Sequence, residues 1–251
     1  MTAGFIAVIP ARYASTRLPG KPLKDIAGKP MIEWVYRQTA RSGASQVIVA
    51  TDDERIAAAC RGFGAAVELT SAEHASGTDR IAELARRFEW PDDQIVVNVQ
   101  GDEPLISPLS IAQTARLLAA RPQAAIATLT APLADEREFR DPNFAKVVTD
   151  RDGWALYFSR APIPWPREGG VSAARRHIGL YAYRAGSLRT ISAAPPCALE
   201  QTEKLEQLRA LWLGLRIAVE QAVEPPSPHV DTEEDLIAIR RHFERVAVPE
   251  V

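Results

Sequence analysis

Apolar residues in the first half of the chain occur in short runs that alternate with segments of helical periodicity. The runs are rich in β-branched residues and are predicted to be strands; they span 5–9, 46–51, 65–69, 94–99 and 124–130. The segments between them are predicted to be amphipathic helices; they span 31–41, 54–63, 78–88 and 107–120. Strands connected by helices of this length form parallel sheets. The pattern therefore predicts an α/β fold, whose ligands bind at the carboxyl ends of the strands.

The pattern changes after about residue 140. Residues 146–149 and 154–158 flank the turn sequence Asp-Arg-Asp-Gly, which predicts a β-hairpin, and a further strand is predicted at 177–183. Between them, the prolines and glycines of 162–170 indicate an irregular loop, which is expected to be mobile. We interpret residues 1–251 as one domain with an antiparallel insertion at about 140–200.

Helical periodicity returns in the last part of the chain. A helix is predicted at 199–212, a strand at 216–219 and a final helix at about 232–245. Gly-Lys-Pro occurs twice, at 20–22 and 28–30, but no longer period recurs. A repeat architecture is therefore excluded.

The composition is that of an ordinary globular protein. Of the 251 residues, 46% are hydrophobic and 25% are charged, and the formal net charge is −2. Because the chain lacks the excess of positive charge that attracts nucleic acid, no nucleic-acid partner is expected. No run approaches the ~18 apolar residues of a membrane span, so no membrane partner is expected either. Cys60 and Cys197 do not have the spacing of a zinc site or of a disulfide framework, which favours the cytoplasm.

A loop rich in cations follows the first predicted strand. Residues 9–23 read IPARYASTRLPGKPL and include Arg12, Arg17 and Lys21. Fixed Arg and Lys donors stabilise a polyphosphate and the charge that develops when its α-phosphorus is attacked. The loop contains neither GxxxxGK[ST] nor GxGxxG, so it is neither a Walker loop nor a dinucleotide fingerprint. Composition alone leaves a solvated basic loop as the alternative.

Five motifs together resemble the 3-deoxy-manno-octulosonate cytidylyltransferase family, also called CMP-Kdo synthetases. They are RYASTRLPGKPL at 12–23, SGTDR at 76–80, VNVQGDEP at 97–104, YFSR at 157–160 and VDTEEDL at 230–236. The motifs follow the family's order over nearly the whole chain. The resemblance implies a Rossmann-like nucleotidyltransferase fold, a homodimer, CTP and Kdo as substrates, and Mg²⁺ as cofactor.

The resemblance also implies a nucleotide site. Its nucleotide-binding residues would be Ala11, Arg12, Lys21, Ser76, Thr78, Arg80 and Gln100, and its catalytic residues Lys21, Arg12 and Asp102. Lys21 is expected to face the charge that develops at the α-phosphate. Ser76 is also a good N-cap for the helix predicted from Thr78, and the two roles can coexist.

Asp102 and Asp231 are the expected magnesium ligands. Asp102 closely follows a predicted strand and would lie at the carboxyl edge of the sheet, beside the basic loop. Mg²⁺ usually takes one or two protein carboxylates together with phosphate oxygens, so these two residues suffice. Without the resemblance, Asp102 could equally be a turn residue. Asp231 or Thr232 could also cap the last helix. Glu103 is expected to point away from the metal.

The sugar side is implied by the resemblance alone. Its residues would be Gln100, Arg160, His177, Tyr181, Glu206 and Gln207. The guanidinium of Arg160 could meet the sugar carboxylate with two parallel hydrogen bonds. From the residues themselves, His177 is more typical of a structural or surface histidine, and 200–208 of a solvated helix face.

Several alternatives remain open at this level. The sugar could be 8-amino-Kdo or a sialic-type acid, and the residues do not identify a general base, the number of metal ions or the dimer interface. A non-catalytic nucleotide sensor on the same fold is disfavoured because Lys21, Asp102 and Asp231 occur together. A Rossmann dehydrogenase is disfavoured by the missing glycine fingerprint.

Overall fold

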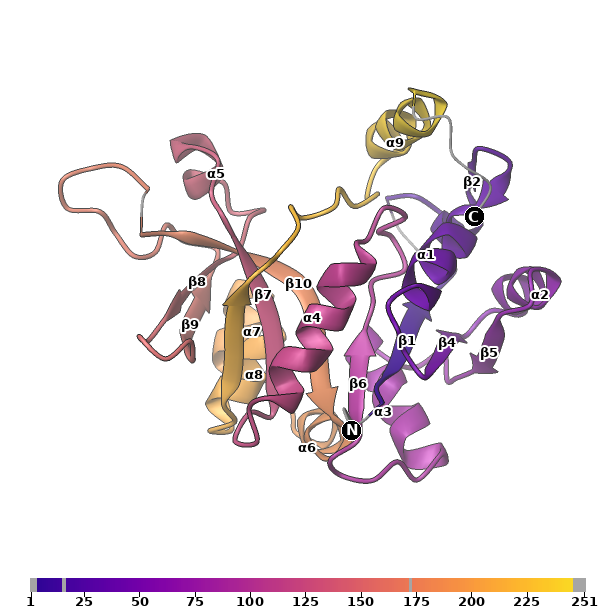
Figure 1. Cartoon of the computed structure of the whole chain (residues 1–251), viewed down its shortest axis with the longest axis horizontal. Coiled ribbons are helices and arrows are strands. Elements are labelled where there is room, and N and C mark those ends of the chain that lie inside the picture. The colour runs from indigo at the N-terminus through magenta and orange to yellow at the C-terminus, as the bar shows by residue number, and fades with distance from the viewer. Residues whose placement is uncertain (1–3, 15–16, 172, 246–251) are drawn as a thin grey trace.

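The computed structural model describes residues 4–14, 17–171 and 173–245, and within these residues the apolar runs form a nine-stranded sheet (Figure 1). Its main path has the order β11–β7–β10–β6–β1–β4–β5, and β8 and β9 extend it from β10. The strands are β1 (Ile6–Ala11), β4 (Gln46–Thr51), β5 (Ala66–Leu69), β6 (Ile95–Asn98), β7 (Ile126–Pro132), β8 (Lys146–Thr149), β9 (Ala155–Ser159), β10 (Arg175–Arg184) and β11 (Ile217–Gln221). The predicted α/β class and mainly parallel sheet are confirmed.

Helices cover both faces of this sheet. One face is packed by α1 (Met31–Ala40), α2 (Glu54–Gly62) and α4 (Pro108–Ala119). The other is packed by α3 (Gly77–Arg87), α6 (Ala185–Ala193) and α8 (Gln207–Trp212). The remaining elements are the 3₁₀ turn Lys21–Leu23, the short hairpin β2 (Asp25–Ile26) and β3 (Lys29–Pro30), α5 (Glu136–Arg140), α7 (Ala198–Glu203) and α9 (Glu233–Arg245).

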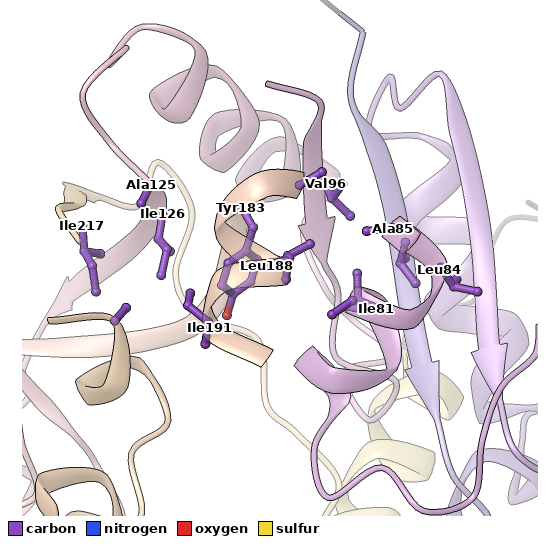
Figure 2. Packing of buried hydrophobic residues seen from close by; sticks show 14 of the residues in the cluster. Ile81, Leu84, Ala85, Val96, Ala125, Ile126, Tyr183, Leu188, Ile191 and Ile217 are labelled. Atoms are coloured by element: carbon purple, nitrogen blue, oxygen red, sulfur yellow. The ribbon is translucent and has the colours of Figure 1, made fainter. Parts of the chain in front are cut away.

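The alternation along β1 explains the two hydrophobic layers. Ile6 and Val8 belong to one buried cluster, whereas Ala7 and Ile9 belong to the other. A strand that is buried on both faces is apolar at consecutive positions, which is the pattern seen in the sequence. Figure 2 shows the first cluster, in which residues of α3 and α6 pack together against the sheet.

β10 is the antiparallel strand inside the main sheet. It lies between β6 and β7 and runs antiparallel to both. Its first residue, Arg175, pairs with Pro132 at the end of β7, and Tyr181 pairs with Asn98 at the end of β6. The segment predicted as an antiparallel insertion therefore delivers the start of β10 to the edge where the parallel strands end.

The single helix predicted at 199–212 is wrong, because the chain breaks there into α7 and α8. Lys204 has a left-handed backbone (φ 52°), which ends α7. The carbonyls of Glu203 and Lys204 accept hydrogen bonds from the Arg160 guanidinium. Because Arg160 is remote in sequence, helical periodicity could not reveal the break. The elements α5, α6, β2 and β3 were not predicted from the sequence.

The C-terminal helix α9 packs against α1, close to β2 (Figure 1). The rings of Trp34 and Phe243 lie 4.6 Å apart and join the two helices. The segment that leads into α9 crosses the carboxyl edge of the sheet, where the N–H of Val230 donates to the carbonyl of Asp102 at 2.9 Å. Among the described residues, no helix is long and apolar enough to cross a membrane.

Candidate active site

Lys21 bridges the two predicted metal ligands. Its Nζ lies 2.7 Å from Asp102 Oδ2 and 3.2 Å from Asp231 Oδ1. Arg17 Nη2 also contacts Asp231 Oδ1, at 3.1 Å. The two carboxylates are therefore near neighbours, and lysine and arginine balance their charge.

The conformation of the loop after β1 places Lys21 at this point. Gly20 has a positive φ of 67°, and a Cβ added to it would lie 3.2 Å from the Tyr13 ring. The 3₁₀ turn that begins at Lys21 depends on this left-handed residue, which glycine adopts at little cost. The Arg55 guanidinium lies over the face of the Tyr13 ring, with its central carbon 3.3 Å from the ring centroid.

Two glycines allow neighbouring loops to pack against Pro10, at the end of β1. A Cβ on Gly101 would lie 2.9 Å from the carbonyl oxygen of Pro10, and a Cβ on Gly77 would lie 3.0 Å from its Cγ. The loop after β6 and the first turn of α3 are thereby drawn against the end of β1. This close packing forms the floor of the site.

Gly101→Ala is expected to disturb this floor, because the added methyl group would collide with backbone that cannot rotate away. The expected cost is about 1–3 kcal/mol of stability, with weaker CTP binding. Gly62→Ala is the matched control, since nothing lies within 4 Å of that position in α2, and it should be neutral or slightly stabilising. Urea unfolding and nucleotide titration of both variants would check this. Equal behaviour of the two variants would contradict the packing argument.

The first pocket has a volume of about 330 Å³ and contains most of the predicted nucleotide-binding residues. Its walls include Ala11, Arg12, Lys21, Ser76, Arg80 and Gln100, together with Asp102 and Asp231. Thr78 is buried and, among the described residues, is not part of this wall. The Ser76 hydroxyl accepts from the N–H of Asp79 at 3.1 Å, so Ser76 caps α3 as predicted.

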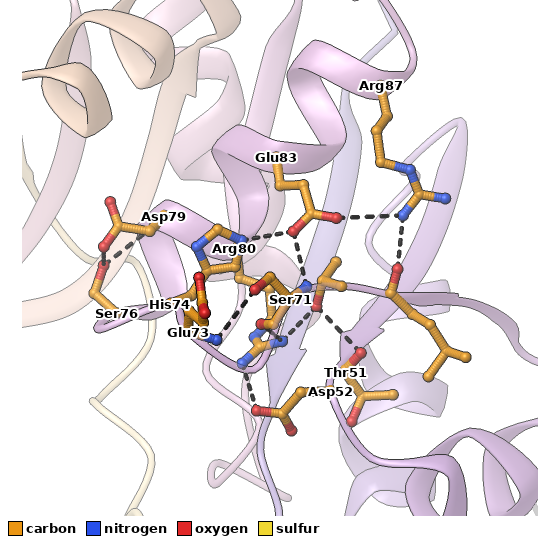
Figure 3. Close-up of polar contacts among 12 residues, drawn as sticks. Thr51, Asp52, Ser71, Glu73, His74, Ser76, Asp79, Arg80, Glu83 and Arg87 are labelled. Carbon is orange, nitrogen blue, oxygen red and sulfur yellow. Dashed lines mark hydrogen bonds and ion pairs between the residues drawn. The ribbon is translucent and has the colours of Figure 1, made fainter.

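Arg80 braces the loop that precedes α3 (Figure 3). Its guanidinium pairs with Asp52 at 2.8 Å, donates to the carbonyl of Ser71 at 3.2 Å and contacts the Thr70 hydroxyl. The side chain is 3% exposed. Most of its donor capacity therefore ties Thr70 and Ser71 to Asp52, although part of Arg80 reaches the pocket wall.

A second pocket, of about 500 Å³, contains most of the predicted sugar-binding residues. Its walls include Gln100, Arg160, His177, Tyr181 and Gln207. Gln100, Asp102 and Asp231 line both pockets. The two cavities therefore meet at the carboxylate pair.

Arg160 is held by backbone carbonyls at the rim of the second pocket. Nε donates to Glu203 O at 2.6 Å, Nη1 to Pro142 O at 2.8 Å and Nη2 to Lys204 O at 3.3 Å. Its own carbonyl accepts from the buried Lys146 ammonium at 2.7 Å. Arg160 thus joins three loops of the pocket wall, and one N–H on each terminal nitrogen is left for a ligand.

His177 is buried and neutral. Burial lowers the pKa of its imidazole from 6.5 to about 3. Nε2 lies 3.1 Å from the Thr128 hydroxyl, which can donate its single hydrogen to the carbonyl of Ile178 or Leu180. With that hydrogen used, the imidazole must be the donor to Thr128. His177 therefore carries its proton on Nε2 and retains Nδ1 as an acceptor.

The low pKa of His177 predicts that the protein loses stability on acidification. The unfolded imidazole takes up a proton below about pH 6.5, whereas the folded one does so only near pH 3, so stability falls as the pH drops through this window. The contribution lost by about pH 5 is roughly 2 kcal/mol. Urea unfolding at about pH 7.5 and pH 5 should show a smaller loss for His177→Gln than for the wild type. An unchanged pH dependence would contradict this assignment.

Two further side chains of the second pocket have distinctive environments. Gln207 is 6% exposed, and its Nε2 has no hydrogen-bond partner among the described residues. An unpaired buried donor in a pocket wall is suited to a ligand oxygen.

Glu103 points away from the first pocket and accepts a hydrogen bond from Ser227 at 2.7 Å. Burial raises its pKa to about 7.

Glu206 lies behind the two pockets rather than in the wall that the structure describes for either. Burial raises the pKa of its carboxyl group, which the hydroxyls of Thr78 and Ser76 face. Glu206 therefore connects the segment that supplies Gln207 to the first turn of α3. Its placement is closer to the nucleotide side than the sequence analysis expected.

Several wall residues were not identified from the sequence. Arg17 was noted only as one cation of the basic loop, and His74, Arg176 and Ser227 were not singled out. His74 lies two positions before Ser76, the first residue of the SGTDR motif, and this proximity was the available signal. Arg176 and Ser227 lie outside the recognised motifs, and only the tertiary structure brings them to the pocket.

The carboxylate pair is compatible with magnesium. Among the described residues, no group of three or more His, Cys, Asp or Glu side chains is placed to hold a metal ion. Mg²⁺ needs only one or two carboxylates when phosphate oxygens and water complete its shell. Asp102 and Asp231 beside a cationic pocket match that donor set.

The chain is similar to known cytidylyltransferases over nearly its whole length. A family model described as Cytidylyltransferase matches residues 6–217. A 3-deoxy-manno-octulosonate cytidylyltransferase of Pseudomonas fluorescens is 55% identical over 97% of this chain and 100% of the relative. One from Vibrio cholerae is 54% identical over 94% and 96%. A solved structure of CMP:2-keto-3-deoxy-manno-octonic acid synthetase complexed with CTP has a TM-score of 0.88 and 40% identity, covering 96% of this chain and 99% of that one. The chain therefore belongs to the 3-deoxy-manno-octulosonate cytidylyltransferase family.

Proposed function

We propose that this protein transfers CMP from CTP to Kdo, forming CMP-Kdo and pyrophosphate for lipopolysaccharide biosynthesis. The observation that carries the proposal is the junction of the two pockets at Gln100, Asp102 and Asp231. The cationic pocket suits the triphosphate and the second pocket suits a polyhydroxylated acid. A transfer reaction requires the two substrates to meet, and the junction is where the α-phosphate and the sugar hydroxyl would do so.

The proposed reaction is a direct displacement. The anomeric hydroxyl oxygen of Kdo forms a bond to the α-phosphorus of CTP, the bond to the bridging oxygen breaks, and pyrophosphate leaves. Arg12 and Lys21 bind the phosphates, and Lys21 is placed to stabilise the charge that builds up in the transition state. The hydroxyl proton passes to a water molecule in the same step, and the scheme needs no covalent enzyme intermediate.

Magnesium is part of the proposal. Asp102 and Asp231 would hold it, and when bound it would neutralise charge on the phosphate oxygens. Both carboxylates contact Lys21. Lys21 must therefore exchange these contacts for phosphate when the nucleotide binds.

Arg160 offers a test of the sugar side. Arg160→Ala is expected to raise the KM for Kdo at least tenfold, about 1.4 kcal/mol or more, while CTP binding measured alone stays near wild type. Arg160→Lys should also be impaired, because an ammonium cannot reproduce the planar fork. Since Arg160 also ties three loops together, thermal unfolding of both variants must be compared. Loss of CTP affinity with unchanged KM for Kdo would reverse the assignment of the pockets.

We further propose a homodimer that acts in the cytoplasm. The family resemblance supports the dimer, and sedimentation of the purified protein would test it. Cys60 and Cys197 are both free and buried, which suits a reducing compartment.

The function is tested by pyrophosphate release from CTP with a panel of sugar acids. Kdo should be turned over faster than 8-amino-Kdo or a sialic acid, and activity should require a divalent cation and prefer CTP to UTP. Faster turnover of another acid would change the assigned substrate. Full activity in EDTA would remove the metal assignment, and binding of CTP without any turnover would favour a nucleotide sensor.

A further inference from the structure

The first pocket is divided by charge. Arg12, Arg17 and Lys21 lie with the two carboxylates on the side of the basic loop. The other side is formed by residues 74–77 and Arg80. Because Asp52 and the 70–71 segment already engage the guanidinium of Arg80, this second side is close to neutral. The triphosphate belongs with the three cations of the basic loop, which outnumber the two carboxylates beside them, so the nucleobase belongs beside residues 74–77.

His74 supplies the imidazole ring on the neutral side. Its Nε2 lies 2.6 Å from Glu83 Oε2. The same carboxylate oxygen accepts the N–H of Ser71 at 2.9 Å, and Arg87 lies 3.6 Å from Oε1. Although burial alone would raise it, the hydrogen bonds from Ser71 and His74 hold the pKa of Glu83 below its usual value.

This contact determines which ring nitrogen a ligand can use. An ionised carboxylate only accepts hydrogen bonds, so Nε2 of His74 must donate. In the neutral imidazole Nδ1 is then an acceptor, and Figure 3 shows the second ring nitrogen turned away from Glu83. Arg80 donates to the carbonyl of Ser71 in the same loop, and Glu83 fixes the ring itself. His74 is therefore a fixed acceptor in the wall of the nucleotide pocket.

We propose that Nδ1 of His74 accepts a hydrogen bond from the 4-amino group of cytosine and thereby selects CTP over UTP, with Glu83 as the positioning residue. Uracil carries a carbonyl oxygen at this position, which would face the Nδ1 lone pair without a hydrogen between them. A buried acceptor that meets another acceptor loses its hydrogen bond and gains none in return. The proposal rests on the proposed cytidylyl transfer and identifies a residue that distinguishes cytosine from uracil.

The test compares His74→Gln with His74→Asn by calorimetric titration of CTP, UTP and zebularine 5′-triphosphate, which lacks the 4-amino group. Glutamine can keep a donor toward Glu83 but removes the acceptor at Nδ1. His74→Gln is therefore expected to weaken CTP binding about tenfold and to leave zebularine triphosphate unchanged. Asparagine places an oxygen near the position of Nδ1, so His74→Asn should keep part of the preference for CTP. His242→Gln, on the exposed face of α9, is the control and should match the wild type.

The outcomes separate base reading from other roles. A loss of affinity for CTP alone supports the proposal, whether it occurs in His74→Gln only or in both His74 variants. A wild-type ratio of CTP to UTP affinity in His74→Gln would overturn it. An equal loss of affinity for all three nucleotides would also overturn it, since His74 would then contribute to pocket structure and not to base selection. If the wild-type protein binds none of the three, the proposed function itself has failed.

Discussion

Lys21→Ala is expected to lower kcat by about 10²-fold or more while raising the KM for CTP much less. The ammonium lies between Asp102 and Asp231, at the junction where the α-phosphate would be attacked. A cation at this point interacts most strongly with the charge that exists only in the transition state, so its loss appears mainly in kcat. Steady-state kinetics with CTP and Kdo would measure the effect.

Two comparisons make the Lys21 prediction specific. Lys24→Ala removes the same charge three residues away, outside the walls described for the two pockets, and should have little effect on turnover. Removing Lys21 should also strengthen Mn²⁺ binding in the absence of CTP, because the two carboxylates lose the ammonium group that they share. A variant with normal kcat and a raised KM would make Lys21 an ordinary phosphate tether.

Asp231→Asn is expected to lose most activity, about 10²-fold, without a measurable change in thermal stability. The structure separates the two roles that the sequence left open at 231–232. The Thr232 hydroxyl accepts the N–H of Asp235 at 3.2 Å, and Asp235 Oδ2 accepts the N–H groups of Thr232 and Asp231. Thr232 is therefore the cap of α9, and the Asp231 carboxylate is turned to Lys21 and Arg17.

Thr232→Ala is the matched variant for Asp231→Asn. It should cost about 1 kcal/mol of stability and keep most of its turnover, the opposite of the result expected for Asp231→Asn. Thermal unfolding and pyrophosphate release should be measured on both proteins, and Asp231→Asn should recover part of its activity at high magnesium. Wild-type turnover of Asp231→Asn at low magnesium would leave Asp102 as the sole metal ligand of the pair.

Most of the nucleotide half of the site could be predicted from the sequence, because its residues lie in the loops that directly follow strands. Ala11 ends β1, Arg12 and Lys21 follow it, and Gln100 and Asp102 follow β6. Parallel strands end at the same edge, so finding the strands was enough to bring these loops together. Thr78 was the exception on this side, because its side chain turns toward Glu206, a residue predicted for the sugar side, behind the pockets.

The sugar half depended on contacts that local patterns do not encode. Arg160 reaches the carbonyls of Glu203 and Lys204, which interrupt a helix that periodicity alone would continue. His177 enters the site because β10 runs antiparallel between β6 and β7. Neither the order of strands nor their direction can be read from one strand's own residues.

The sequence by itself determined the α/β class, the strands buried on both faces, and the motifs that identify the cationic loop and the two aspartates. These features are local, because side-chain periodicity and loop composition report directly on burial and charge. The tertiary structure alone decided that Lys21 bridges Asp102 and Asp231, that Thr232 caps α9, and that the two pockets meet at the carboxylates. These features join segments far apart in the chain, and their geometry follows from strand order, register and loop packing, which exist only once the chain has folded.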